Sequence, residues 1–524
     1  MRIVHRKLFT VKTSKFYSTV NIKPALYRNV WRPVIGLEVH AQILSASKLF
    51  SRVCAKYGAP PNTQVGIFEA AHPGTLPVLN KRCVEAAINT ALALQAQVNK
   101  VSRFDRKHYF YPDLPAGYQI TQKDCPIASN GRINFIVSNP ASNPKIYHHS
   151  VRLVQLQLEE DSGKSIHDAE FNRVLVDLNR AGLPLMELVF APELHDGEEA
   201  AALVKELSLI LSKLGTCSCK MEEGALRVDA NISVHKESEP LGERTEVKNL
   251  NSIRSLVRAI NYEIERQVDI LEGSGMVVNE TRRFDNVSGK TIKMRDKDTI
   301  HDYRFMPEPN LPPLWLYDSS EPNYIPSGSL DINVVRKDMK ELPEETRQRL
   351  MKEYGISLEN AMILVNDNSL TKYFTAVMAQ NQRQARLVCN LLLNNLLGII
   401  NSLDISIENC PMAASSFGEV VDLLQNGLIL HAIALKIIHA VCVDGDSRTP
   451  TEIVLANNWS KFSDELIDGI IEQVIKNNFA VVEKYRRGKK KVFKTLMGKA
   501  VAATESRADM QKVNDILKNK LDEE

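Results

Sequence analysis

Alternation of apolar and polar residues predicts β-strands in the first half of the chain. In residues 34–42 every second position is apolar, which leaves Glu38 and His40 on the opposite face. Residues 226–235 alternate in the same way and place Asp229 on their polar face. Successive side chains of a strand point to opposite faces, so each segment should bury one face and keep polar groups on the other.

Two further segments continue this pattern. Glu246 and Lys248 share one side of residues 244–250, and Asp177 lies on the polar side of residues 174–182. Antiparallel sheets commonly pack one face on the core and leave the other polar. If all these strands belong to one antiparallel sheet, their polar faces line a single basin.

An apolar-rich run at 151–158 predicts another strand, and it ends in the adjacent carboxylates Glu159, Glu160 and Asp161. Three carboxylates this close repel one another unless a cation or a proton lies between them. The following Gly-Lys-Ser, with Lys164 at its centre, suggests a phosphate-binding loop. That loop needs a glycine five residues before its second glycine, where this chain has Leu158. The nucleotide fingerprint therefore fails, and Lys164 is at most an auxiliary phosphate contact.

The expected basin has the composition of a site for a hard divalent cation. Carboxylate-rich sites suit Mg²⁺, which typically also binds substrate phosphates. Phosphoryl transfer needs such charge neutralisation, together with Lys and Arg side chains that hold the phosphate. Taken singly, each of these cations is better interpreted as an ordinary surface charge. The candidate ligands are Glu38, His40, Glu159, Glu160, Asp229 and Glu246. The candidate phosphate contacts are Arg180, Arg227, Lys248, Arg282 and Arg295.

Beyond residue 313 the apolar spacing changes to three and four residues, which predicts helices. The expected helices are 344–354, 358–365, 369–397, 416–425 and 429–443. Ser357 and Ser369 stand where helix N-caps are expected, and residues 444–451 are typical of a linker. We interpret the apolar faces of these helices as core packing.

Composition limits the class of protein. The chain has 524 residues, enough for about three domains, with 44% apolar and 25% charged residues and a net charge of +3. No apolar run approaches the roughly 18 residues needed to cross a bilayer. The eight cysteines are spread along the chain, and only Cys217 and Cys219 are close together. One such pair is a weak zinc signal, so mostly reduced thiols are expected.

The two ends of the chain are basic. Residues 1–37 contain no acid and eight basic residues, a composition typical of a mitochondrial transit peptide cleaved near Ser18, or alternatively of a basic disordered arm. Near the other end, residues 484–499 contain eight basic residues and no acid. Such a run is often a solvated face, but it is also typical of a surface that binds nucleic-acid phosphates. Basic and aromatic residues also interleave at 103–110, which indicates either base stacking or a tightly packed turn.

Many long motifs, in order, resemble one family, the B subunits of tRNA-dependent amidotransferases (GatB). They are VIGLEVHAQ at 34–42, SKLFS at 47–51, PGTLPVLN at 73–80, FDRKHYFYPDLPAGYQITQ at 104–122, LEEDSGKS at 158–165, DLNRAGLPLMELV at 177–189, MEEGALRVDANISV at 221–234, TEVKNLNSI at 245–253 and PEPNLPPL at 307–314.

The resemblance implies an α+β fold with an N-terminal arm at 1–30, a sheet-based cradle at 31–325, an all-helical domain at 326–450 and a small helical tail at 451–524. It implies a carbon–nitrogen ligase of the mitochondrial matrix, in a fungal form. With ATP and Mg²⁺ the B subunit phosphorylates the glutamate of misacylated Glu-tRNA(Gln), and ammonia from a separate amidase, the A subunit, displaces the phosphate. A small third subunit, C or its fungal replacement F, completes the complex.

Site residues are carried over from the same resemblance. The metal positions are the six candidate ligands already named. The implied catalytic residues are Glu159, Glu160, Lys248 and Arg180. The implied nucleotide contacts are Arg227, Arg282, Arg295 and Lys164. The tail contacts tRNA, and the implied residues are Lys484, Arg486, Arg487, Lys489, Lys490 and Lys491.

The chain departs from the family pattern in a few places. Gln157 stands where the family usually has His, Phe305 and Met306 replace Tyr-Phe, and Asn310 replaces Asp. The first change removes an imidazole that could carry a proton beside the metal. The alternative function is a non-catalytic tRNA-binding scaffold of the same complex, although such a scaffold should have lost at least one ligand. A stand-alone enzyme is disfavoured because the sequence shows no glutamine-hydrolysing signature.

Overall fold

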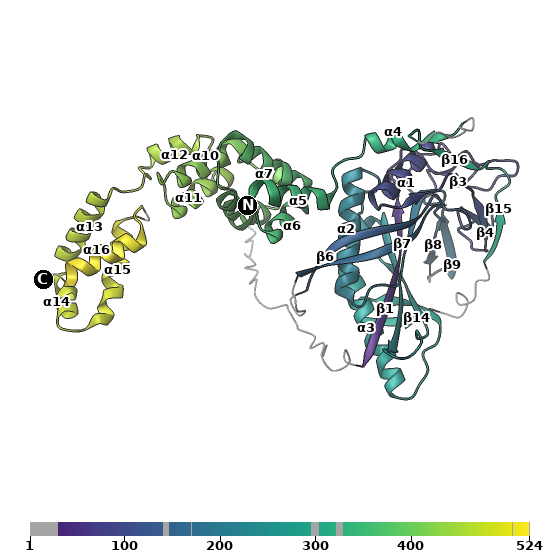
Figure 1. Cartoon of the computed structure of the whole chain (residues 1–524), viewed down its shortest axis with the longest axis horizontal. Coiled ribbons are helices and arrows are strands. Elements are labelled where there is room, and N and C mark those ends of the chain that lie inside the picture. Colours follow the sequence, from purple (N-terminus) through teal and green to yellow (C-terminus); the bar gives the residue numbers. More distant parts are fainter. Residues whose placement is uncertain are drawn as a thin grey trace, which may run out of the picture. The chain divides into compact units, whose positions relative to one another are not determined.

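The computed structural model describes residues 30–139, 146–168, 170–294, 303–320, 328–505 and 507–522. They form two compact units that divide between Lys340 and Glu341 (Figure 1). Most of the basic amino-terminal arm, residues 1–29, lies outside the described residues. None of the described helices combines the length and apolar composition needed to cross a bilayer. An α+β fold, strand-rich first and helical afterwards, is confirmed.

The first unit is built on a nine-stranded sheet. Neighbouring strands run antiparallel except β12 and β13, which are parallel. In spatial order the strands are β14 (Lys290–Lys293), β13 (Glu280–Asp285), β12 (Thr245–Leu250), β11 (Leu226–Lys236), β1 (Trp31–Gln42), β10 (Pro184–Phe190), β7 (Ile146–Glu160), β6 (Ala128–Ser138) and β2 (Gln97–Val98).

Two long helices cover one face of this sheet, α2 (Gly197–Leu214) and α3 (Ile253–Glu272) (Figure 1). Each begins at a residue whose side chain accepts a hydrogen bond from the first turn, Asp196 for α2 and Ser252 for α3. The apolar members of the alternating strands are fully buried. They must therefore face these helices, which leaves the polar members on the opposite face.

Shorter elements complete the unit. They are α1 (Lys81–Ala93), α4 (Ile332–Lys337), a sheet of β15 (Arg304–Pro307), β4 (Asp105–His108) and β5 (Tyr118–Thr121), a sheet of β17 (Leu330–Asp331), β16 (Leu314–Tyr317) and β3 (Val101–Ser102), and a hairpin of β8 (Lys164–Asp168) and β9 (Arg173–Asp177).

The expectation that residues 174–182 join the main sheet is wrong. The first residues of this segment form β9, which among the described strands pairs with β8 alone, and the side chains of Val174 and Leu175 are exposed. Alternation alone cannot distinguish a core strand from an exposed hairpin, because both have a period of two.

An irregularity in β7 changes which of its side chains face the helices. The pairing of β7 with β10 shifts register between Val189 and Phe190. Before the shift Val151 and Leu153 are buried in the core, and after it Leu156 and Leu158 are buried. An extra residue in one strand inverts the alternation. Odd-numbered residues near the end of β7 therefore point away from α2 and α3.

The second unit is helical. Its elements are α5 (Pro343–Tyr354), α6 (Leu358–Val365), α7 (Asn368–Gln380), α8 (Ala385–Leu391), a π-helical turn (Leu392–Leu396), α9 (Leu397–Ser402), α10 (Ala414–Gln425), α11 (His431–Cys442), α12 (Pro450–Ala456), α13 (Asp464–Asn477), α14 (Phe479–Arg486), α15 (Phe493–Ala503) and α16 (Met510–Asp522).

The helix expected at 369–397 is interrupted at residues 381–384. Arg383 lies in the interruption, where it is almost wholly buried, pairs with Asp422 at 2.6 Å and donates to the carbonyl of Val377. This buried arginine satisfies the backbone at the end of α7, so the chain can leave the helix there. The N-cap at Ser357 is confirmed, whereas α7 is capped by Asp367 and not by Ser369.

The helical unit contains two apolar cores. The first extends to Ile453 and Val454 of α12, and the second begins at Ile467 of α13. The interpretation of residues 444–451 as a linker into the tail is therefore wrong, because the helix that follows packs on the preceding core. Pro450 starts α12, with Thr449 as its N-cap. The other domain boundaries stay predictions.

Candidate active site

A row of polar side chains crosses four strands on the sheet face opposite α2 and α3. His40 of β1 pairs with Glu187 of β10 on one side and with Arg227 of β11 on the other. Glu187 pairs in turn with Gln157 of β7. Directly paired residues of antiparallel strands point to the same face, so strand register alone assembles this row.

A second set of acids completes the cluster. Glu38 pairs with Asp229 of β11, and their oxygens together with a ring nitrogen of His40 lie within 4.8 Å of one another. The same spacing holds among His40, Glu159 and Glu187. His40 is thus common to two overlapping groups. We call the five residues Glu38, His40, Glu159, Glu187 and Asp229 the acidic basin.

Glu187 was missed by the sequence analysis, which named the other four residues. The sequence contained a signal, because Glu187 is the one charged residue of the otherwise apolar strand Pro184–Phe190. In the structure its side chain is buried. A lone carboxylate in such a strand needs a partner or a ligand.

Burial and crowding change the acidity of these groups. Burial, together with the nearby cations Arg227, Lys107 and Lys248, lowers the pKa of His40 to about 3, so its imidazole is neutral and has a lone pair. Burial raises the pKa of Asp229 to about 6. Burial and the neighbouring acids Glu159 and Glu38 hold the pKa of Glu187 well above its ordinary value.

Glu159 has a carboxylate oxygen that is available for a ligand. Its Oε2 is buried and accepts no hydrogen bond from the described residues, while Oε1 accepts one from Gln119 at 2.9 Å. Burial raises the pKa of Glu159 by more than nearby Lys107 lowers it. A buried oxygen without a donor is costly, and a bound cation would satisfy it. Four carboxylates and a neutral imidazole therefore fit a divalent metal.

The β4–β5 hairpin supplies further groups to the basin. Nζ of Lys107 lies 4.0 Å from Oε2 of Glu159 and 4.8 Å from the centre of the Tyr303 ring. Tyr109 donates to Gln119 at 2.9 Å, which fixes the amide that binds Glu159. Of the two interpretations of residues 103–110, these contacts support the packed turn with aromatic supports.

Glu246 lies at the edge of the basin. Its carboxylate is 3.6 Å from Nζ of Lys248 and accepts a hydrogen bond from Thr281 at 3.2 Å. Asn249 next to them has a positive φ of 58°, and its N–H donates to Asp229 at 2.8 Å. The irregular pairing of β12 thus orients Asp229, while Glu246 holds Lys248 near it.

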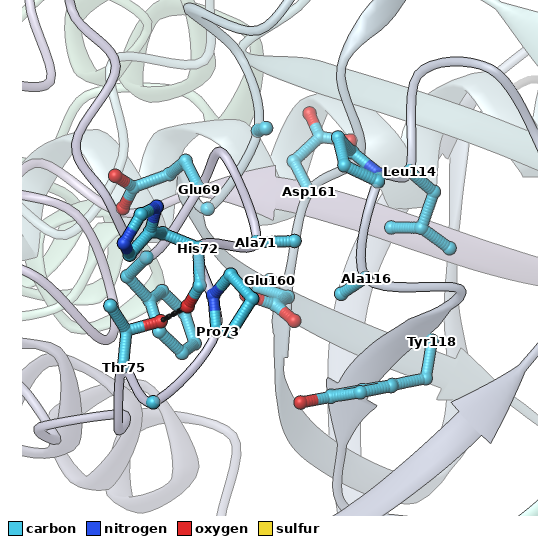
Figure 2. A pocket seen from close by; sticks show the side chains of 15 residues that line it. Glu69, Ala71, His72, Pro73, Thr75, Leu114, Ala116, Tyr118, Glu160 and Asp161 are labelled. Atoms are coloured by element: carbon cyan, nitrogen blue, oxygen red, sulfur yellow. Dashed lines mark hydrogen bonds between the residues drawn. The ribbon is translucent and has the colours of Figure 1, made fainter.

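Glu160 does not join the basin. It follows Glu159 on β7 and therefore points to the other side. Its carboxylate accepts a hydrogen bond from the N–H of Ile120 at 2.8 Å, and burial raises its pKa to about 8. It lines a separate pocket of about 240 Å³ with Glu69 and His72 (Figure 2). The structure therefore does not bring Glu160 together with the other predicted metal ligands, and its role as a ligand stays a prediction.

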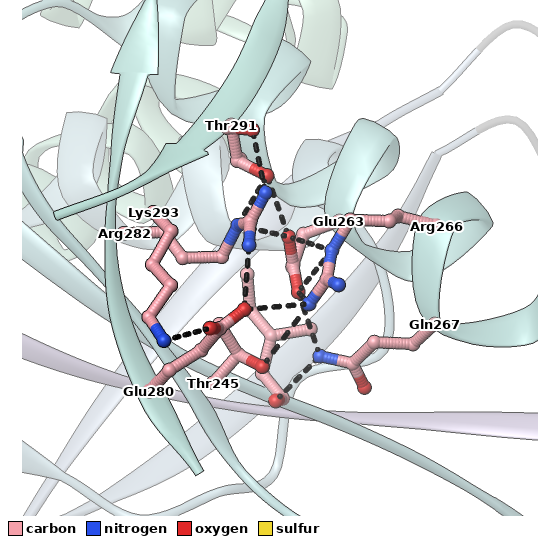
Figure 3. A network of polar contacts seen from close by, with 9 residues as sticks. Thr245, Glu263, Arg266, Gln267, Glu280, Arg282, Thr291 and Lys293 are labelled. Carbon is pink, nitrogen blue, oxygen red and sulfur yellow. Dashed lines mark hydrogen bonds and ion pairs between the residues drawn. The ribbon is translucent and has the colours of Figure 1, made fainter. Parts of the chain in front are cut away.

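Arg282 cannot contact a phosphate in the basin. It is paired with Val247 across β12 and β13, and Val247 faces the core. Its guanidinium lies against Glu263, Glu280 and Thr291 beside α3 (Figure 3). These contacts give the arginine a structural role, and the nucleotide contact expected of it stays a prediction that this geometry does not support.

A second pocket of about 490 Å³ adjoins the basin through Arg227. Arg227 donates to Asp161 at 3.0 Å, and Arg180 lies 3.5 Å from the same oxygen. Arg180 also donates to the carbonyls of Ser162 and Gly163, so it holds the turn that follows β7. Lys164 is exposed and lines the same pocket, whereas Arg295 lies outside the described residues.

Gln157 occupies the position where the family usually has histidine. Its amide donates to Glu187 and, at 3.3 Å, to Thr121, while its carbonyl accepts from Gln155 at 3.0 Å. The amide therefore supplies a hydrogen bond to a basin carboxylate. It cannot exchange a proton at neutral pH as an imidazole can.

The predicted tRNA contacts of the tail are all exposed, on α14 or in the short segment that follows it. Within this group, Lys490 is 3.2 Å from Asp522 and lies over the ring of Tyr485, and Arg487 pairs with Glu483. The others are Lys484, Arg486, Lys489 and Lys491.

Comparison with known proteins gives two family matches. Residues 33–320 match the GatB/GatE catalytic domain, and residues 372–521 match the GatB domain. The first match contains every residue of the acidic basin, and the second contains the basic tail.

Full-length relatives agree with these matches. The mitochondrial glutamyl-tRNA(Gln) amidotransferase B subunit from Aedes aegypti is 50% identical, covering 98% of each chain. The human protein of that name is 45% identical over 94% of this chain and 88% of its own. The aspartyl/glutamyl-tRNA(Asn/Gln) amidotransferase B subunit from Rickettsia canadensis is 42% identical over 94% of this chain and 98% of its own. These relatives do not test the expectation of a fungal source.

Proposed function

This chain belongs to the GatB family, and on that premise we propose that it is the mitochondrial protein that activates the glutamate of Glu-tRNA(Gln) with ATP. The ammonia comes from a partner amidase, the A subunit, and a small third subunit, C or F, completes the complex. The reaction is that of an ATP-dependent carbon–nitrogen ligase. The observation that carries the proposal is the acidic basin beside a second pocket, which Arg180, Arg227 and Lys164 line together with acidic side chains.

The acidic basin and the lysines beside it have different proposed roles. When bound, Mg²⁺ would be held by the basin carboxylates and His40, and it would neutralise charge on the phosphate oxygens. Lys107 and Lys248 face the same space, and nearby carboxylates raise the pKa of both lysines against the effect of burial. Both lysines are therefore charged and can hold an anionic carboxylate or phosphate.

The proposed chemistry has two steps. The γ-carboxylate of the tRNA-bound glutamate attacks the terminal phosphorus of ATP, which forms an acyl phosphate and releases ADP. Ammonia then attacks the acyl carbon, phosphate leaves with the C–O bonding electrons, and loss of a proton gives the amide. The second pocket supports the nucleotide assignment, because Arg180, Arg227 and Lys164 line it next to the basin.

The direct test is single-turnover formation of the acyl phosphate. The purified complex is mixed with Glu-tRNA(Gln), Mg²⁺ and ATP labelled in the terminal phosphate, without glutamine or ammonia. Label should transfer to the tRNA-bound glutamate and return as inorganic phosphate when ammonia is added. The alternative, a tRNA-binding scaffold, predicts tRNA binding without label transfer.

Arg227 should contribute more to ATP binding than Lys164. It lies in the polar row with His40 and is held by Asp161, whereas Lys164 is exposed at the pocket rim. We expect Arg227→Gln to raise the KM for ATP about 10-fold, which corresponds to about 1.4 kcal/mol. Steady-state kinetics with varied ATP measures this change.

The matched control for Arg227 is Lys164→Ala in the same pocket. A lysine exposed to water contributes little to the binding of an anion. The KM of the Lys164→Ala variant for ATP should therefore change less than about 3-fold. Equal effects of the two substitutions would contradict the assignment of this pocket to the nucleotide.

The tail should bind tRNA through its exposed lysines. Lys489→Ala with Lys491→Ala should weaken tRNA binding about 10-fold and lower the salt slope of log Kd by roughly one per lost phosphate contact. Filter binding at several salt concentrations measures both quantities. Lys520→Ala is the control in the same domain, because Asp468 and Glu472 already neutralise Lys520. Binding that stays as salt-dependent as in the parent would refute the role of the tail.

A further inference from the structure

Two histidines and a glutamate converge at the edge of the sheet far from the acidic basin. They are His149 of β7, His195 in the loop before α2, and Glu199 in the first turn of α2. Their ligand atoms lie within 4.8 Å of one another. His149 is ten residues before Glu159 on β7, roughly 33 Å along a strand, and it precedes the register shift, so it faces α2 instead of the basin.

The two imidazoles and the carboxylate have the spacing of metal ligands. Nδ1 of His195 is 3.1 Å from Oε2 of Glu199, and Nε2 of His149 is 3.9 Å from the same oxygen. Zinc bonds of about 2.0–2.2 Å separate tetrahedral ligands by roughly 3.5 Å, a value that lies between these two distances. Nε2 of His149 also lies 3.1 Å from the carbonyl oxygen of Glu193, a hydrogen bond that zinc would replace.

The surroundings hold each ligand in place. Glu199 is buried, and its Oε1 accepts a hydrogen bond from Tyr147 at 3.0 Å. Its Oε2 accepts one from the backbone N–H of His195 at 2.8 Å, which holds this oxygen beside the His195 ring. The ring of Phe135 packs edge-on against His149 with 5.4 Å between centres. Such outer contacts orient ligands in metal sites.

We propose that His149, His195 and Glu199 bind Zn²⁺ and thereby fasten the β6–β7 hairpin to the start of α2. Imidazole and carboxylate ligands suit zinc, and three protein ligands from separate elements make the site a cross-link within the fold. The partly exposed His195 leaves one side open to water. This site is independent of the proposed reaction, since none of its residues belongs to the acidic basin.

Zinc binding should be measured on the full chain after chelator treatment, with excess Mg²⁺ present to occupy the basin. Titration of Zn²⁺ against a chromophoric chelator should show one tight equivalent in the parent. His195→Ala should lose it, and because this side chain is exposed the variant should fold normally. Tyr147→Phe should bind about 10- to 100-fold more weakly, as expected for a group that orients a ligand.

The matched control is His148→Ala, because His148 is the exposed neighbour of His149 on the opposite face of β7. It should retain the full equivalent. Co²⁺ in place of Zn²⁺ should give the visible absorption of a four-coordinate site in the parent and in His148→Ala, but not in His195→Ala. Hydrogen exchange of residues 146–153 should slow with Zn²⁺ in the same two proteins.

Two results would overturn the proposal. One is a parent chain that binds no zinc in the presence of Mg²⁺, in which case the cluster is only a hydrogen-bonded clamp. The other is a His195→Ala variant that binds zinc as tightly as the parent.

Discussion

Replacing Glu159 by Gln should abolish the ATP-dependent activation of glutamate, with a rate loss of at least about 10³-fold, or about 4 kcal/mol. The variant should still fold and bind tRNA. Glu159 offers the basin a buried oxygen that accepts no hydrogen bond from the described residues. An amide has the same shape but lacks the charge that a divalent cation requires.

The stability of this variant distinguishes a functional carboxylate from a structural one. Burial and the neighbouring acids Glu38 and Asp161 disfavour the charged form of Glu159 and raise its pKa, with Lys107 as the opposing cation. Removing the charge should therefore leave the unfolding midpoint without Mg²⁺ unchanged or higher. Mg²⁺ should stabilise the parent, by about 2.7 kcal/mol at 100 times its Kd, and should not stabilise the variant.

Glu160→Gln is the matched control, since Glu160 is adjacent in sequence but on the other side of β7. It should retain metal-dependent stabilisation, because its carboxylate binds the N–H of Ile120 in a separate pocket. Acyl phosphate formation and thermal unfolding with and without Mg²⁺ measure the pair. An active Glu159→Gln variant, or equal metal responses of the two variants, would contradict the site.

Replacing Glu263 by Ala should destabilise the first unit by about 3–5 kcal/mol, as expected when one partner of a buried ion pair is removed. Glu263 is fully buried and accepts from Arg266 at 2.6 Å, Thr291 at 2.8 Å and Gln267 at 3.0 Å (Figure 3). Arg282 lies 3.7 Å from it. Without this carboxylate, two largely buried guanidinium groups lose their common partner.

Glu265→Ala is the control for this prediction, because Glu265 is exposed two residues further along α3. It should cost less than about 0.5 kcal/mol. Trp31 is a suitable fluorescent probe, since its indole donates to Glu272 at the end of α3 and packs on Val268. Urea unfolding followed through Trp31 should separate the two variants. Equal midpoints would show that the network in Figure 3 contributes little to stability.

Periodicity predicted the local structure well where one face of an element is buried. The strands containing Glu38 and Asp229 and the helix at 358–365 were correctly placed, because apolar spacing reports which side meets a core. Family motifs added the identity of the site, and mitochondrial relatives support the expected location.

The errors have a common cause, which is that periodicity contains no information about pairing. Asp177 belongs to an exposed hairpin, and the helix expected at 369–397 is interrupted by a buried arginine whose partner is about forty residues away. Neither contact can be read from the neighbouring sequence.

Apolar spacing and family motifs were enough to identify the strand faces that bear Glu38, His40 and Asp229, and the family to which they belong. That Glu159 joins them, that Glu160 does not, and that Glu187 completes the cluster follows from how the strands pair. The shift in β7 selects which of two adjacent carboxylates faces the basin, and antiparallel pairing brings a buried glutamate beside His40.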